Sequence, residues 1–124
     1  MIAGTDPTPW QRFEDGTIVR VERDLEDTVR MWIDAARLRS RHGDGGTLFV
    51  FRLARCELLR YTPLDEPPLV ELPAIAASEP NIIAARVLGD GTMEIRGSAG
   101  TLELRYASLA IELDTGRELA LDEL

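Results

Sequence analysis

The 124-residue chain has no lysine, and it has only one cysteine, one histidine, one asparagine and one glutamine. All fourteen basic residues are arginine, a bias typical of a GC-rich bacterial genome. Without lysine the chain cannot form a phosphate-binding loop of the GxxxxGK type, in which a lysine contacts the phosphates. The glycines at 43, 45 and 46 are therefore interpreted as part of a flexible loop.

The single cysteine, Cys56, excludes an intrachain disulfide and favours a reducing compartment. One thiol and one imidazole, that of His42, cannot build a Cys/His zinc site. Cys56 falls in an apolar strand pattern and is expected to be an inert core residue, and His42 is expected to be structural or solvated. We expect no catalytic residue, no cofactor and no metal.

Long hydrophobic runs are also missing. No apolar run approaches the roughly 18–20 residues that a membrane helix needs. The first residues show no basic region followed by an apolar stretch, so no secretory signal is recognised. These observations predict a cytoplasmic protein without a membrane partner.

The acidic charge is concentrated in the second half of the chain. Residues 1–62 carry ten arginines and ten acidic residues, whereas residues 63–124 carry four arginines and twelve acidic residues, which accounts for the whole net charge of −8. An acidic half repels nucleic acid and attracts basic proteins. The expected partner is therefore a protein, either a basic one or a second copy of this chain.

Alternation of apolar and polar residues between glycine turns dominates the last third. Residues 82–88, 93–96 and 101–113 are separated by Gly89-Asp90-Gly91 and Gly97-Ser98-Ala99-Gly100. Asp-Gly between alternating runs is a strong hairpin signal because the turn requires positive φ. We predict a mainly β fold, a single domain over 1–124 that is an antiparallel β-sandwich or open curved barrel of about seven or eight short strands.

The first half contains one ambiguous segment. Residues 1–9 are expected to be a tail or an edge segment, followed by the anchors Trp10 and Phe13 and a strand over 17–23 with Val19 and Val21 on one side. Residues 24–42 fit either a helix ending at Gly43 or a strand. We favour the strand, because the segment follows directly on 17–23 and because residues 28–33 are rich in β-branched and aromatic side chains. In this interpretation a turn at 25–27 joins the two strands, and a bulge lies near Ala36.

The middle of the chain combines a predicted strand with a proline-rich connection. Residues 47–53 predict a strand that supplies Phe49 and Phe51 to the core, and 56–61 predict a shorter strand or its continuation after a bulge. Residues 62–80 hold five of the seven prolines and form a long connection, in which 69–72 could add an edge strand.

Six charged residues are candidate partner contacts. Three are acidic residues of the last strands, and three are arginines that would alternate along one face of a strand. They are Glu94, Glu103, Glu112, Arg37, Arg39 and Arg41.

The order of motifs over roughly residues 10–60 resembles a known family. Trp10 precedes Phe13-Glu14-Asp15-Gly16, followed by alternating residues at 18, 20 and 22 and at 29, 31 and 33, then Phe49, Phe51, Cys56 and Leu58. It is similar to small β-sandwich immunity proteins of bacterial polymorphic-toxin systems, in which a histidine occupies the position of Glu14. The resemblance implies an inhibitor that binds a toxin through its surface, and an acidic surface suits a basic nuclease.

Two other functions fit the same sequence. A small-molecule-binding β-barrel would need a deep pocket, lined here by aromatic residues such as Trp10, Trp32 and Tyr106. A structural or self-assembling subunit would instead join copies through edge strands.

Overall fold

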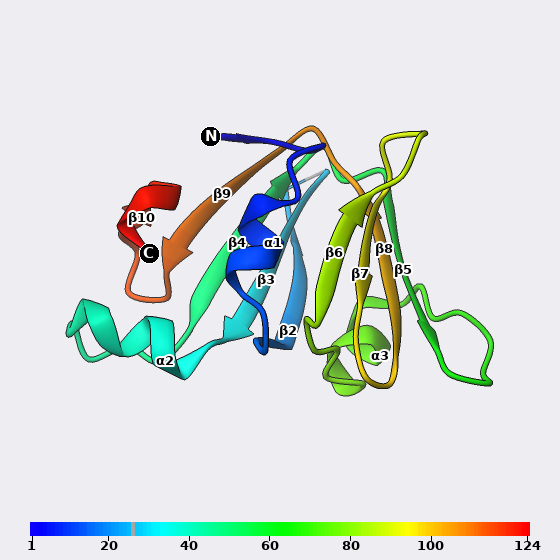
Figure 1. Ribbon diagram of the computed structural model, residues 1–124, viewed down its shortest axis with the longest axis horizontal. Coiled ribbons are helices and arrows are strands. Elements are labelled where there is room, and N and C mark those ends of the chain that lie inside the picture. The colour runs from blue at the N-terminus through cyan, green and yellow to red at the C-terminus, as the bar shows by residue number, and fades with distance from the viewer. Residues whose placement is uncertain (26) are drawn as a thin grey trace.

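The computed structural model describes residues 1–25 and 27–124 and is mainly β. Two antiparallel sheets are formed, one of six strands and one of four, as the sequence predicts. The order in the larger sheet is β1-β9-β4-β3-β2, with β10 also paired to β9, and the order in the smaller sheet is β5-β8-β7-β6. This arrangement is compatible with a β-sandwich. In Figure 1 the strands of the smaller sheet stand to the right of those of the larger sheet.

The elements of the larger sheet come from three parts of the chain. They are β1 (Ile2–Ala3), β2 (Thr17–Asp24), β3 (Thr28–Asp34), β4 (Phe49–Ala54), β9 (Ser108–Leu113) and β10 (Glu118–Leu119). The smaller sheet contains β5 (Leu58–Pro63), β6 (Ala84–Val87), β7 (Met93–Arg96) and β8 (Gly100–Arg105). The helical segments are α1 (Thr8–Arg12), α2 (Ala36–Arg39), α3 (Leu72–Ala77) and the 3₁₀ turns η1 (Ser40–His42) and η2 (Leu121–Glu123).

The core is formed by the inward faces of both sheets together with α1. Trp10 packs edge-on against Phe51 with ring centroids 4.9 Å apart. Phe13 makes similar contacts with Phe49 and Phe51, each at 4.8 Å. Such aromatic pairs stabilise a core beyond the area they bury. The anchoring role predicted for Trp10 and Phe13 is confirmed, since both are fully buried.

The strand interpretation of residues 28–34 is confirmed, but the bulge near Ala36 is wrong. The chain leaves β3 into α2 and η1, which end at Gly43 in the left-handed region with φ of 54°. Ala, Arg and Leu favour a helix once no neighbouring strand competes for their backbone groups. The predicted turn at 25–27 includes residue 26, which lies outside the described residues.

Several strand boundaries differ from the sequence prediction. A register shift between Ile18 and Arg20 places Ile18 and Val21 together in the core, instead of Val19 with Val21. The alternating segment 101–113 is divided between two strands, β8 and β9, which belong to different sheets. The strand predicted at 56–61 is a separate strand, β5, which begins at Leu58, because the chain turns at Arg55 with φ of 53° and changes sheet.

The N-terminal segment supplies an edge strand, one of the two expectations for residues 1–9, but the helices in this segment and in the proline-rich connection were not predicted. Residues 2–3 form an edge strand, and residues 8–12 form α1, where a carboxylate oxygen of Asp6 accepts a hydrogen bond of 2.9 Å from the amide of Thr8. The predicted edge strand over 69–72 is wrong, because only Leu69 pairs, with Tyr61, and Leu72 begins α3. Proline near the start of α1 and α3 is compatible with a helix because the first amides lack partners.

Candidate functional site

The three acidic residues predicted as partner contacts are already paired within their own sheets. Glu94 binds Arg86 at 2.8 Å, Glu103 binds Arg60 at 3.0 Å, and Glu112 binds Arg52 at 3.3 Å. Glu94 and Glu103 are direct cross-strand neighbours, so the flanking arginines offset their mutual repulsion. The negative charge of these residues is partly neutralised before any partner arrives.

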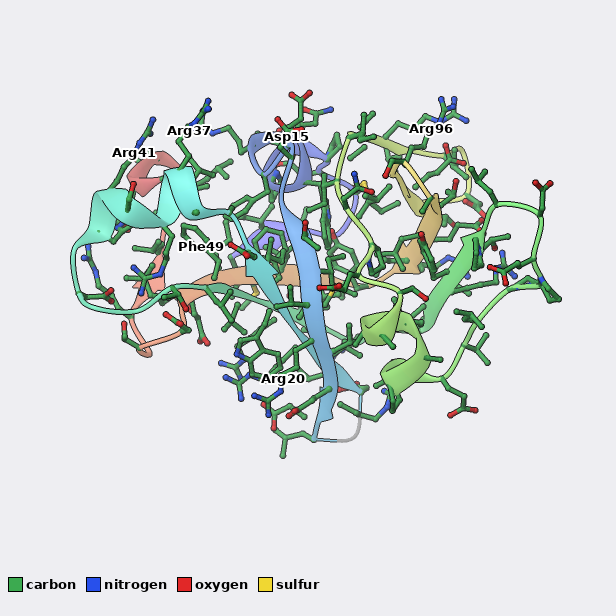
Figure 2. All side chains as sticks on the ribbon, turned by 90° about the horizontal axis from the view of Figure 1, so that it is seen from below. Asp15, Arg20, Arg37, Arg41, Phe49 and Arg96 are labelled. Carbon is green, nitrogen blue, oxygen red and sulfur yellow. The ribbon has the colours of Figure 1, made fainter. Side chains whose placement is uncertain are left out.

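The three candidate arginines do not form the strand face that the sequence predicted, because they lie on α2 and η1. Arg37 and Arg41 are four residues apart and point away from the protein on the same side (Figure 2). Arg39 turns inward and is only 3% exposed. The helix therefore separates Arg39 from the other two.

Arg39 holds the loop after η1 against the end of β9. Its Nη2 atom donates to Asp114 at 2.8 Å and lies 2.6 Å from Asp44, and its Nε atom donates to the carbonyl of Leu48 at 2.9 Å. Asp114 also accepts hydrogen bonds from the amides of Thr47 and Leu48. Asp44 additionally accepts a hydrogen bond from Thr115. This network joins three chain segments and is structural.

The network shifts the acidity of both carboxylates. Burial opposes ionisation of Asp114, but hydrogen bonds from Arg39 and the two amides lower its pKa below the ordinary value. The hydroxyl of Thr115, followed by Arg39, lowers the pKa of Asp44 more strongly. Both groups are therefore held as carboxylates that stabilise the fold.

The environments of Cys56 and His42 do not suggest nucleophilic chemistry. Burial raises the pKa of the Cys56 thiol to about 11, which leaves little reactive thiolate at neutral pH. The ring of His42 lies edge-on to Phe49 at 6.0 Å. Across residues 1–25 and 27–124, no group of three or more His, Cys, Asp or Glu side chains is placed to hold a metal ion.

The three aromatic residues predicted to line a ligand pocket do not share one site, because Trp10 and Tyr106 lie in the core and Trp32 lies outside it. Trp10 is fully buried and donates a hydrogen bond to the hydroxyl of Tyr106. Trp32 lies on the opposite face of β3 from the core residues Met31 and Ile33. The guanidinium groups of Arg20 and Arg30 cover its ring at 4.4 and 4.8 Å.

Glu14 and Asp15, the adjacent carboxylates of the first turn, line a hollow of about 410 Å³ between α1 and α2. Arg12 and Arg37 line the same hollow. The hollow therefore has two positive and two negative groups, and it does not select a ligand of one charge.

The unpaired acidic residues gather in the proline-rich connection, residues 62–80. Of the twelve acidic residues in the second half, six have no ion-pair partner among the described residues. Four of these six belong to the connection: Asp65, Glu66, Glu71 and Glu79. No basic residue occurs between Arg60 and Arg86. The excess negative charge is therefore localised in this connection, whose helix α3 packs against β2.

The same connection borders a hollow of about 480 Å³. It is lined by Tyr61, Pro63, Glu66, Pro67, Pro68, Leu69, Ser78 and Ala99. Figure 1 shows the connection leaving β5 as a wide loop and returning to α3. The sequence predicted this long loop and its charge, but not the hollow, which requires the turn between β7 and β8 and the end of α3.

Two large apolar side chains of the connection remain exposed. Leu64 is 67% exposed and Val70 is 62% exposed. Single exposed apolar residues are common on protein surfaces. Here they lie beside a hollow and four unpaired carboxylates, a combination of apolar area and charge that is typical of a protein-binding surface.

None of the helices in the described parts of the chain has the length and apolar character needed to cross a membrane. No protein-family model, curated protein or solved structure matches the chain.

Proposed function

We propose that this chain is a protein-interaction domain that binds a positively charged protein through the proline-rich connection. The observation that carries this proposal is the gathering of four unpaired carboxylates, with no basic residue from 61 to 85. Complementary charge accelerates association with a basic partner and disfavours acidic partners. The exposed side chains of Leu64 and Val70 supply apolar area for the contact.

The specific function that we propose is that of an immunity-type inhibitor of a basic bacterial toxin. The motifs around Trp10 and Phe13 support it, because they resemble those of polymorphic-toxin immunity proteins and both residues anchor the core. An inhibitor that covers a toxin needs a stable scaffold and a complementary surface, but no reactive group. The structural environments of Cys56 and Arg39 agree with such a role.

The proposal predicts that a toxin-domain protein is encoded beside this chain, and that protein provides the test. The toxin domain expressed alone should stop bacterial growth, and co-expression of this chain should restore it. The two proteins should also purify as a complex. A variant that loses four charges of the connection should bind more slowly and with a weaker salt dependence. It carries D65N, E66Q, E71Q and E79Q.

A matched variant loses the same number of charges elsewhere. Its four substitutions are at exposed acidic residues without an ion-pair partner among the described residues: E14Q, D34N, E118Q and D122N. We expect it to bind as the parent chain does. Equal losses in both variants would show that net charge, and not the connection, determines association. The absence of any complex with the neighbouring protein would refute the toxin assignment.

A further inference from the structure

The hollow beside the connection has walls that are rigid and largely apolar. Pro63, Pro67, Pro68, Leu69 and Ala99 provide most of them. Proline fixes its own φ angle, so these walls lose little conformational freedom when a ligand binds. A volume of about 480 Å³ accommodates an apolar side chain with its flanking backbone.

Backbone hydrogen bonds hold this hollow open in the free protein. Tyr61 and Leu69 exchange two of them, with N–O distances of 3.0 and 2.7 Å. The amide of Leu64 donates to the carbonyl of Ala99 at 2.9 Å, which joins the loop to the turn between β7 and β8. The hollow is thus preorganised, although its walls come from segments distant in the sequence.

Tyr61 gives the hollow a polar group without a partner. Its side chain is 2% exposed, and its hydroxyl bonds to no residue in the described part of the chain, yet it is not one of the polar atoms buried without a partner, so solvent reaches it. Burial alone raises the pKa of this hydroxyl. A ligand that supplies an acceptor can therefore bond to this hydroxyl in place of water.

The carboxylates define the charge of the ligand. Glu66 lines the hollow, and Asp65, Glu71 and Glu79 belong to the same connection. An acidic ligand would be repelled, whereas arginine or lysine residues next to the inserted side chain would be attracted.

From these observations we infer that the hollow is the anchor site for a basic peptide segment, whose apolar side chain enters between the prolines while its backbone carbonyl accepts a hydrogen bond from Tyr61. This inference rests on the proposed function and names the chemistry of the partner at that surface. The flanking basic side chains lie against the carboxylates of the connection.

Three synthetic peptides test the required chemistry. The first is acetyl-Arg-Arg-Leu-Arg-Arg-amide, the second has serine in place of leucine, and the third has glutamate in place of each arginine. The leucine peptide should shift the amide NMR signals of the non-proline residues among 61–70 and those of residues 78 and 99. The serine peptide should bind about tenfold more weakly, as expected for the loss of a buried leucine. The glutamate peptide should not bind.

Two variants of the protein test the proposed contacts. Tyr61→Phe removes a hydroxyl that bonds to no described residue. It should therefore lower the affinity for the leucine peptide by up to about tenfold without lowering the stability of the protein. Ala99→Leu should block the hollow, whereas the matched control Ala120→Leu adds the same group at an exposed site elsewhere. Unfolding curves of each variant confirm that the fold is retained.

The anchor site is disproved if the leucine peptide does not bind, if its signals map elsewhere, or if Ala99→Leu binds it as well as the parent chain does. A protein partner that still depends on the four carboxylates would then leave the proposed function standing. Conversely, peptide binding in the hollow without any complex with the neighbouring protein would refute the toxin assignment alone.

Discussion

The indole nitrogen of Trp10 donates a hydrogen bond of 2.7 Å to the hydroxyl of Tyr106, which joins α1 to the crossover between β8 and β9. Both side chains are buried. At this crossover the amide of Ala107 also bonds to Ala54, and that of Gly4 bonds to Ala107, each at 2.9 Å. The start of the chain is thereby attached to the point where the chain passes from one sheet to the other.

Tyr106→Phe should destabilise the fold by about 1–3 kcal/mol, because the buried indole N–H of Trp10 loses its acceptor. Urea unfolding followed by tryptophan fluorescence measures the change. Phe substitution at Tyr61, whose hydroxyl bonds to no described residue, is the matched control and should leave the free energy of unfolding nearly unchanged. An equal loss in both variants would contradict this role of the Trp10–Tyr106 bond.

Alkaline conditions should destabilise the protein partly through Tyr106. Burial raises the pKa of its hydroxyl to about 12, whereas the pKa of a tyrosine in the unfolded chain is about 10. Between these values the unfolded chain binds fewer protons than the folded one, so stability falls as pH rises through this window. The decline, measured by urea unfolding across this range, should be shallower in Tyr106→Phe. Identical slopes would show that Tyr106 contributes nothing to it.

The Arg39 network should make the fold sensitive to acid. The pKa values of Asp44 and Asp114 are lowered in the folded state, so their stabilisation is complete above the unfolded value of about 4 and disappears as pH falls through the folded values. Arg39→Met should lower stability at neutral pH by about 2–3 kcal/mol. Its loss of stability between neutral and acid pH should be smaller than that of the parent chain.

Arg37→Met provides the control for this measurement, since Arg37 lies on the same short helix but is exposed. We expect its unfolding free energy to match that of the parent chain at each pH. If Arg39→Met retains the full acid sensitivity, the network is not its cause.

Cys56 should react with thiol reagents only when the protein unfolds. Its thiol is buried and has a pKa raised to about 11, so near pH 8 the folded protein presents almost no accessible thiolate. The reaction with an aromatic disulfide reagent should be slow in buffer and fast in guanidinium. Ala120→Cys in a Cys56→Ala background offers an exposed thiol for comparison. Equally fast reaction of Cys56 in buffer would mean that the folded chain exposes this thiol.

Local sequence signals predicted the strands better than the short helices. Alternation and β-branched residues identify β3 and β4 because such side chains fit a half-buried pleated surface. The helices α1 and α3 were missed although each carries proline near its start, since five or six residues leave little helical periodicity to detect. In α2, the residues favour a helix, but adjacency to a strand suggested continuation of the sheet.

The candidate site was only partly visible in the sequence. The proline content and acidic charge of residues 62–80 identified a long connection in the acidic half. The sequence could not show that Glu94, Glu103 and Glu112 have arginine partners, because cross-strand register determines those pairs. It also could not show which carboxylates remain unpaired.

The amino-acid sequence by itself determined the β-rich class, the positions of most strands and the placement of negative charge, because these follow from side-chain alternation, turn residues and composition. Only the tertiary structure decided which strands share a sheet, that Arg39 turns inward, and that Tyr61 borders a hollow with Ala99. Those features depend on pairing between distant segments, such as Leu64 with Ala99. Such pairing depends on the packing of the whole core, which no local pattern encodes.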